Sequence, residues 1–356
     1  MVERLEVQVS TPYPIVVGSG LPLAETVAET LLPGVAAVLT DSNVGPLHAR
    51  GVVRELEAGG WRVTGVIEVP AGEGSKSLEV YGETVRRLAR SGMSRDGTLF
   101  ALGGGVVGDL GGFVAGTYMR GINFVALPTS LLAMVDSSVG GKVGVDLPEG
   151  KNLVGGFVRP RLVLAESDRL ATLPDRELSC GLAEVVKMGL LSGGDFYEDL
   201  ALIGEARNRD QGALKTLVMH SIRFKAEVVA EDELEAGRRA ILNYGHTIGH
   251  GLETAAGYDL AHGEAISCGM VAAARLSADE FGEDHVELHK ELLHLAGLPT
   301  RFSGINVEKV LAAMGRDKKR RGGEHRFVLL EEIGRPAWDV PVGEDKVREA
   351  IESVFE

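Results

Sequence analysis

The chain has 356 residues, of which 44% are apolar and 25% charged, and its formal net charge is -14. This composition predicts a globular protein of about two domains and excludes a nucleic acid or an anionic membrane as the main partner. The N-terminal stretch MVERLEVQVS has no signal pattern, no long apolar run follows, and Cys180 and Cys268 form no disulfide framework. We therefore expect a cytoplasmic protein.

The first half alternates short β-rich runs with helical stretches. Buried strands are predicted over 36–40, 63–69, 97–102 and 122–127. Helices are predicted near 43–58, 76–90 and 104–117. This alternation is typical of a mainly parallel α/β sheet, and we expect such a domain over 1–168.

From about residue 174 the apolar residues follow helical periodicity. We expect an all-helical domain over 169–356, although HRFVLL (325–330) and PAWDV (336–340) are candidate strands. The cleft between two such domains is the expected place for a ligand.

A glycine motif follows the third predicted strand. Residues 103–108 read G-x-G-x-x-G, a loop that lets the backbone approach a pyrophosphate at a helix N-terminus. The acidic residue at a strand end comes earlier, as Asp41 with Asn43 in TDSN, and this order differs from the ordinary dehydrogenase fingerprint. Glu73 and Lys76 follow another strand end. Because several strand ends converge, we expect a nucleotide site here.

Polar residues recur at helical spacing in RRAILNYGHTIGHGLE. Arg239, Asn243, His246 and His250 are spaced i, i+4, i+7 and i+11, which predicts one helical face. Such a stripe is costly in a core unless the groups bind something. Spacing alone nominates His246 and His250 as a chelating pair.

Further metal-ligand types lie nearby in the predicted helical domain. His262 stands at a predicted helix start, and Glu184 and Lys187 are three residues apart on one helical face. Two or three histidines with a carboxylate form a suitable Zn²⁺ set that leaves a position open for substrate.

Several cations stand beside glycines or among apolar residues: Arg120, Lys142, Lys151, Lys225, Arg239 and Lys318. Lys142 and Lys151 lie in glycine-rich loops near Asp136 and Asn152, where an anion is favoured. In an acidic chain this grouping indicates a substrate that carries phosphate, and a carboxylate is a candidate second anionic group on the same substrate.

The chain resembles the 3-dehydroquinate synthase family over nearly its whole length. The resemblance is carried by the motifs at 72–77, 101–157, 172–189, 242–253 and 262–270. It implies an N-terminal NAD-binding α/β domain, a helical metal-binding domain and a homodimer.

The resemblance also implies site residues. NAD would contact Asp41, Asn43, Glu73, Lys76, Gly104, Gly105, Asp109, Thr129, Ser130, Lys142, Lys151, Thr172, Leu173 and Glu177. Zinc or cobalt would be held by Glu184, His246 and His262, which makes His250 a substrate contact. The other substrate and catalytic residues would be Asp136, Lys142, Lys151, Asn152, Lys187, Lys225, Arg239, Asn243 and either Lys318 or Lys319. Arg120 would act in the partner subunit's site.

The implied reaction converts 3-deoxy-D-arabino-heptulosonate 7-phosphate to 3-dehydroquinate and phosphate in the shikimate pathway. Transient oxidation by NAD would acidify a C–H bond, phosphate would leave by β-elimination, and re-reduction and an aldol closure would follow. Three alternatives remain: a metal-containing NAD-dependent polyol or glycerol-phosphate dehydrogenase, a related cyclase whose substrate lacks a carboxylate, and a non-catalytic ligand-binding protein.

Overall fold

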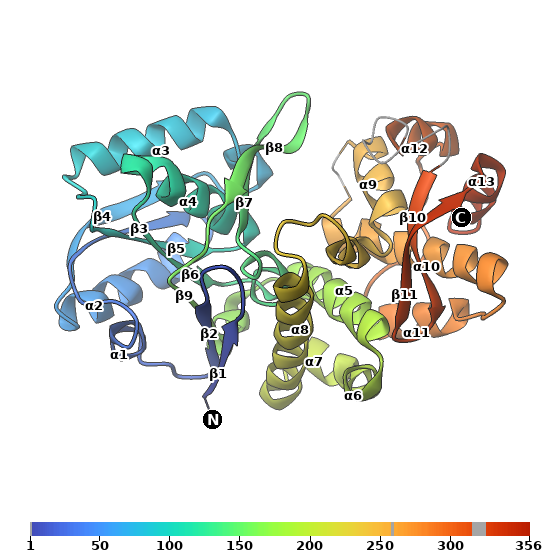
Figure 1. Cartoon of the computed structure of the whole chain (residues 1–356), viewed down its shortest axis with the longest axis horizontal. Helices are drawn as coiled ribbons and strands as arrows, with labels where there is room; N and C mark the ends of the chain where they lie inside the picture. Colours follow the sequence, from blue (N-terminus) through green and yellow to red (C-terminus); the bar gives the residue numbers. More distant parts are fainter. Residues whose placement is uncertain (1, 258–259, 315–324) are drawn as a thin grey trace. The chain divides into compact units, whose positions relative to one another are not determined.

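The computed structural model describes residues 2–257, 260–314 and 325–356, so the predicted substrate residue Lys318 lies outside the described residues. The chain forms two compact units (Figure 1). The first contains Met1–Pro174 and Lys225–Leu234, and the second contains Asp175–Phe224 and Glu235–Glu356. The division thus follows Pro174 and not residue 168, because the short 3₁₀ helix Ser167–Thr172 packs with the first unit.

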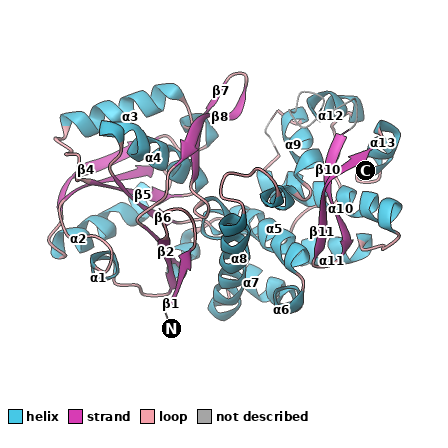
Figure 2. Ribbon diagram, in the orientation of Figure 1, coloured by secondary structure: helices cyan, strands magenta, loops and turns pink. Residues whose placement is uncertain are grey.

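The first unit is built on a seven-stranded sheet in the order β1-β2-β9-β6-β5-β3-β4. Figure 2 shows the strands in magenta and the helices in cyan. The strands are β1 (Glu3–Val7), β2 (Tyr13–Gly18), β3 (Val35–Asp41), β4 (Arg62–Val69), β5 (Thr98–Gly103), β6 (Asn123–Pro128) and β9 (Leu162–Glu166). All neighbours pair in parallel except the edge strand β1, which is antiparallel to β2. The four predicted strands are β3 to β6, and the expectation of a mainly parallel sheet is confirmed.

Helices cover both faces of this sheet, as its apolar strands require. They are α1 (Leu23–Ala28), α2 (Arg50–Ala58), α3 (Leu78–Arg90) and α4 (Gly105–Thr117). Val38 and Phe100 pack in one core cluster with Leu56 of α2. The next residues along the strands, Leu39 and Ala101, face Gly111 of α4 on the other side. A separate antiparallel hairpin consists of β7 (Lys142–Leu147) and β8 (Gly150–Phe157).

The second unit is mostly helical. Its helices are α5 (Asp175–Ser192), α6 (Gly194–Glu198), α7 (Ile203–Arg207), α8 (Gln211–Glu231), α9 (His246–Ala255), α10 (His262–Phe281), α11 (Val286–Leu295), α12 (Val307–Met314) and α13 (Glu344–Glu352), with the end of α8 counted in the first unit. The expectation of a helical domain is confirmed, and the two candidate strands are also present: β10 (His325–Glu332) and β11 (Arg335–Val342) form an antiparallel hairpin, so the domain is not all-helical. Its tight turn is possible because Gly334 takes a φ of 83°.

The polar stripe does not lie on one helix. Arg239 and Asn243 belong to a 3₁₀ helix (Arg238–Asn243), Tyr244 is extended, and Gly245 has a φ of 76° before α9 begins at His246. The prediction of one continuous helical face is therefore wrong. A glycine in the left-handed region ends one helix and sets the direction of the next.

Candidate active site and metal centre

The carboxyl ends of β3 and β5 form the nucleotide-binding edge expected of such a sheet. From β3 the chain moves outward to β4 and then returns to β5 on the other side of β3. Ligands of parallel α/β sheets bind at such a reversal of strand order. Asp41 ends β3, Gly103 ends β5, and the preceding residues Thr40 and Leu102 pair directly. The upstream position of the acidic residue is thus explained by topology.

The glycines of the loop lie close to two serine hydroxyl groups. Gly104 caps α4, and a Cβ atom there would lie 3.4 Å from Ser130 Oγ. A Cβ atom on Gly105 would lie 3.2 Å from Ser137 Oγ. Asp41 Oδ1 accepts the backbone N–H of Asn43 at 2.9 Å, which holds the turn after β3. A glycine turn leading into the N-terminus of a 13-residue helix fits a dinucleotide pyrophosphate.

Two more strand ends supply predicted NAD contacts. Thr129 and Ser130 directly follow β6, and Thr172 and Leu173 follow β9. Thr172 Oγ1 lies 2.8 Å from Nε2 of His48. Glu177, the last predicted NAD contact, is exposed near the start of α5 in the second unit.

A buried lysine joins predicted NAD and substrate contacts in the first unit. The Nζ of Lys76, which is 5% exposed, lies 2.8 Å from Asp109 Oδ2 and 2.6 Å from Asn152 Oδ1. Glu73 Oε1 lies 3.6 Å from Lys76 and 3.9 Å from Lys151 Nζ. Burial alone lowers the pKa of Lys76, but the Asp109 and Glu73 carboxylates raise it, so the ammonium stays charged.

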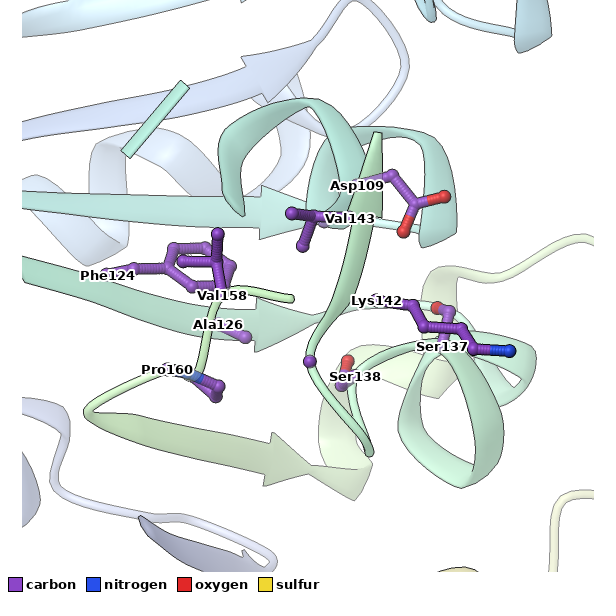
Figure 3. A pocket seen from close by; sticks show the side chains of 11 residues that line it. Asp109, Phe124, Ala126, Ser137, Ser138, Lys142, Val143, Val158 and Pro160 are labelled. Atoms are coloured by element: carbon purple, nitrogen blue, oxygen red, sulfur yellow. The ribbon is translucent and has the colours of Figure 1, made fainter. Parts of the chain in front are cut away.

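A second pair of a lysine and a carboxylate also lies within the first unit. Lys225 Nζ donates to Asp136, at 2.6 Å from Oδ1 and 2.5 Å from the backbone carbonyl. Lys142 lines a cavity of about 20 Å³ together with Asp109 and Ser137 (Figure 3). That volume holds about one water molecule, so the cavity is not by itself a substrate site.

In the second unit, three residues distant in sequence form a potential metal cluster. Glu184 lies on α5, His246 is the first residue of α9, and His262 is the first residue of α10. Their ligand atoms lie within 4.8 Å of one another, with Glu184 Oε1 at 3.5 Å from His246 Nε2 and 3.6 Å from His262 Nε2. His250, which spacing alone nominates, falls outside this group.

The electrostatics of the cluster suit a divalent cation. Glu184 is wholly buried, and neither of its oxygens accepts a regularly aligned hydrogen bond within the described part of the chain, although Lys187 is ion-paired with it. Burial raises the pKa of Glu184, but Lys187 and His262 lower it, so the carboxylate stays ionised. Burial and Lys187 hold the pKa of His246 well below its usual range, which leaves a neutral nitrogen ligand.

The pKa of His262, the third member of the cluster, is shifted in the opposite direction to that of His246. Burial lowers the pKa of His262, but hydrogen bonding and charge attraction from Glu184 and Glu253 raise it to about 9. Without a metal the His262 ring is therefore protonated, and binding of zinc or cobalt between Glu184 and the two imidazoles would displace that proton.

The unit that holds the cluster also contains buried cations. Lys187 is 1% exposed and Arg239 is 2% exposed. Asn243 donates to the Ala240 carbonyl at 3.1 Å, and Glu235 Oε1 is 3.4 Å from its Nδ2. Lys187 is ion-paired with Glu184, and buried cations such as Lys187 and Arg239 are tolerated where they meet anions.

Sequence reasoning missed two residues beside the cluster. The Tyr244 carbonyl lies 3.0 Å from His246 Nδ1, and the buried Tyr244 hydroxyl donates to His289 Nε2 at 2.8 Å. Burial lowers the pKa of His289 to about 4, so its ring stays neutral. Glu253 also contacts His262. The spacing in the sequence could have indicated Glu253, because it follows His246 by seven residues and therefore lies on the same helical face. Nothing local indicates the partner of Tyr244, because α11 is distant in sequence.

Two solved structures share this architecture. A 2-deoxy-scyllo-inosose synthase complexed with carbaglucose-6-phosphate, NAD⁺ and Co²⁺ is 27% identical, with a TM-score of 0.89 over 99% of this chain and 100% of that chain. A 2-epi-5-epi-valiolone synthase from Streptomyces hygroscopicus with NAD⁺ and Zn²⁺ bound is 26% identical, with a TM-score of 0.86 over 97% of each chain. The fold and the site therefore define an enzyme of the class of these cyclases.

The particular family follows from the sequence matches. Family models of the 3-dehydroquinate synthase N-terminal and C-terminal regions match residues 66–180 and 181–320. A 3-dehydroquinate synthase from Acidithiobacillus ferrooxidans is 47% identical over 328 residues, which are 90% of each chain. The chain belongs to the 3-dehydroquinate synthase family. The family resemblance is thus confirmed. None of the helices in the described residues is long and apolar enough to cross a membrane.

Proposed function

We propose that this chain converts 3-deoxy-D-arabino-heptulosonate 7-phosphate to 3-dehydroquinate and phosphate, with NAD and a divalent metal as cofactors. It would then be a carbon–oxygen lyase and cyclase. The observation that carries the proposal is the cluster of Glu184, His246 and His262 in a chain that belongs to the 3-dehydroquinate synthase family. A polyol dehydrogenase would also need the metal and the nucleotide, and the 47% identity to a 3-dehydroquinate synthase favours the cyclase.

The cofactors have separate places in this proposal. NAD would bind at the edge of the sheet where the strand order reverses, through the predicted contacts that follow the strands, of which Asp41 is the first and Leu173 the last. The metal would bind Glu184, His246 and His262. When bound, they supply reversible hydride acceptance and polarisation of the substrate oxygen.

The chain's own residues would bind and orient the substrate. Lys142, Asn152, Arg239 and Lys318 are assigned to its anionic groups, which aligns the substrate and stabilises charge. Asp136, Lys187, Lys225 and His250 are assigned to hydroxyl groups and proton handling, with Lys151 and Asn243 as further contacts. The departing phosphate itself serves as the base for elimination, so no side-chain base is required.

A phosphate-release assay tests the proposed function. With the heptulosonate phosphate, NAD⁺ and Zn²⁺ or Co²⁺, we expect phosphate to be released continuously while NADH absorbance does not accumulate, because the hydride is returned within each turnover. Stoichiometric NADH formation would indicate a dehydrogenase. Equal turnover of a hexose phosphate without a carboxylate would indicate a related cyclase.

We further propose a homodimer, located in the cytoplasm, in which Arg120 completes the partner's site. Arg120 is exposed and has a φ of 68° after Met119 with a φ of 52°. Two successive left-handed non-glycine residues are strained, and such strain persists where a side chain must be presented in a particular direction.

Replacing Arg120 by alanine is expected to abolish most activity without unfolding the protein. In an equal mixture with His262→Ala, hybrid dimers contain one intact site, so about a quarter of wild-type turnover should return after subunit exchange. Turnover of the mixture is compared with that of each variant alone and with that of wild-type protein taken through the same exchange procedure. If hybrids form and no activity returns, Arg120 does not act in trans.

A further inference from the structure

A buried carboxylate outside the proposed ligand set faces one of its histidines. Glu253 lies on α9 and is 5% exposed. Its Oε1 is 3.4 Å from Nδ1 of His262, and its Oε2 is 3.9 Å from Nε2 of His250. A buried carboxylate is costly unless it is paired, so this placement needs a physical reason.

The His262 ring lies between two carboxylates. Its Nδ1 faces Glu253, and its Nε2 is 3.6 Å from Glu184 Oε1. A neutral imidazole carries a proton on one nitrogen and a lone pair on the other. A carboxylate beside Nδ1 favours the proton there, which directs the lone pair of Nε2 toward Glu184 and the rest of the cluster.

The other histidine of the cluster is oriented in the same way but by a weaker partner. His246 Nδ1 lies 3.0 Å from the Tyr244 carbonyl, and its Nε2 is 3.5 Å from Glu184 Oε1. Both rings therefore present Nε2 to one carboxylate. An ionised carboxylate raises the basicity of an imidazole ligand more than a neutral carbonyl does.

We propose that Glu253 is a positioning residue that holds His262 as its Nδ1–H tautomer and so strengthens divalent-metal binding by Glu184, His246 and His262. This inference rests on the proposed metal site. Glu253 acts through His262 and does not itself ligate the metal.

The alternative is that Glu253 is itself a ligand, because His250, Glu253 and His262 also have ligand atoms within 4.8 Å of one another. The two sets differ in burial. Glu184 is fully buried and lies within 3.6 Å of both His246 and His262, whereas the His250 side chain is 48% exposed and lies 3.9 Å from Glu253. These observations favour the Glu184 set as the metal site and Glu253 as its support.

Competition between the metal-free full-length protein and a chromophoric chelator for Zn²⁺ tests this role. We expect the wild type to bind one equivalent. In Glu253→Ala the Kd should rise about 10- to 100-fold. Glu253→Gln should lie between the two, because its amide oxygen still accepts the Nδ1–H but carries no charge. Glu280→Gln, the same substitution at the far end of α10, should bind zinc like the wild type.

Turnover at rising metal concentration separates positioning from a structural defect. Glu253→Gln should need more metal for half-maximal turnover, yet reach a kcat within a few-fold of wild type. The ¹⁵N spectrum of the zinc-loaded wild type should show a protonated Nδ1 on His262.

The outcomes separate this inference from the proposed function. If the wild type binds no zinc, the proposed metal site fails as a whole. If it binds one equivalent and Glu253→Gln and Glu253→Ala bind equally well, only the role of Glu253 fails. If the wild type binds two equivalents and Glu253→Gln loses one, Glu253 is a ligand and the positioning role is wrong.

Discussion

Replacing His262 by alanine is expected to remove the bound metal and to lower turnover by at least about a thousand-fold. A metal Lewis acid supplies several kcal/mol of transition-state stabilisation, and each 1.4 kcal/mol is about tenfold in rate. The fold should persist, because His262 is at the first turn of α10 and its side chain is about one-third exposed. Metal content by mass spectrometry, phosphate release and circular dichroism measure the three effects.

The matched control is His220→Ala. His220 is on α8, where its Nε2 pairs with Asp199 Oδ2 at 2.9 Å, and it belongs to neither histidine group. It should retain metal and turnover. Full activity of the wild type in thoroughly metal-free buffer, or a full equivalent of metal in His262→Ala, would contradict the assignment of the cluster.

Replacing Gly269 by alanine is expected to destabilise the protein by about 3 kcal/mol or more and to weaken metal binding. A Cβ atom at Gly269 would lie 2.1 Å from the Gly245 carbonyl oxygen and 2.9 Å from the Gly249 nitrogen. Both are backbone atoms, so they cannot move as a flexible side chain does. Relief of the clash must move α9 away from α10, and this separates His246 from His262.

The change is measured by the denaturant midpoint of unfolding and by zinc affinity in the same preparation. Gly204→Ala on α7 is the control, because its nearest neighbour would be Leu295 Cδ2 at 3.9 Å and alanine favours a helix. It should unfold at or above the wild-type midpoint. An unchanged midpoint and zinc affinity in Gly269→Ala would show that the close contact of these helices is not required.

Much of the first unit could be predicted because its signals are local. Runs such as 36–40 and 97–102 consist mostly of apolar residues, since both faces of β3 and β5 are buried. The outer elements were harder: β1 and β2 carry mixed residues at the N-terminus, and β9 is only five residues long. No strand prediction was made there.

Local sequence signals predict the candidate site less well than they predict the strands. Helical spacing nominated His246 and His250, whereas the structure groups His246 with Glu184 and His262. The family resemblance indicated that set, but spacing could not, because the three residues come from three helices. Spacing also failed at Gly245, where a left-handed turn replaces the expected continuous helix.

The sequence by itself determined the alternating α/β pattern, the glycine loop, the inventory of carboxylates, imidazoles and cations, and membership of the family. These features depend on residue type and on short-range periodicity. Only the tertiary structure decided that Asp41 ends beside Gly103, that Glu253 faces His262, and that Tyr244 reaches His289. Such contacts depend on strand order and on backbone packing such as that of Gly269 against Gly245, which join segments far apart in the chain.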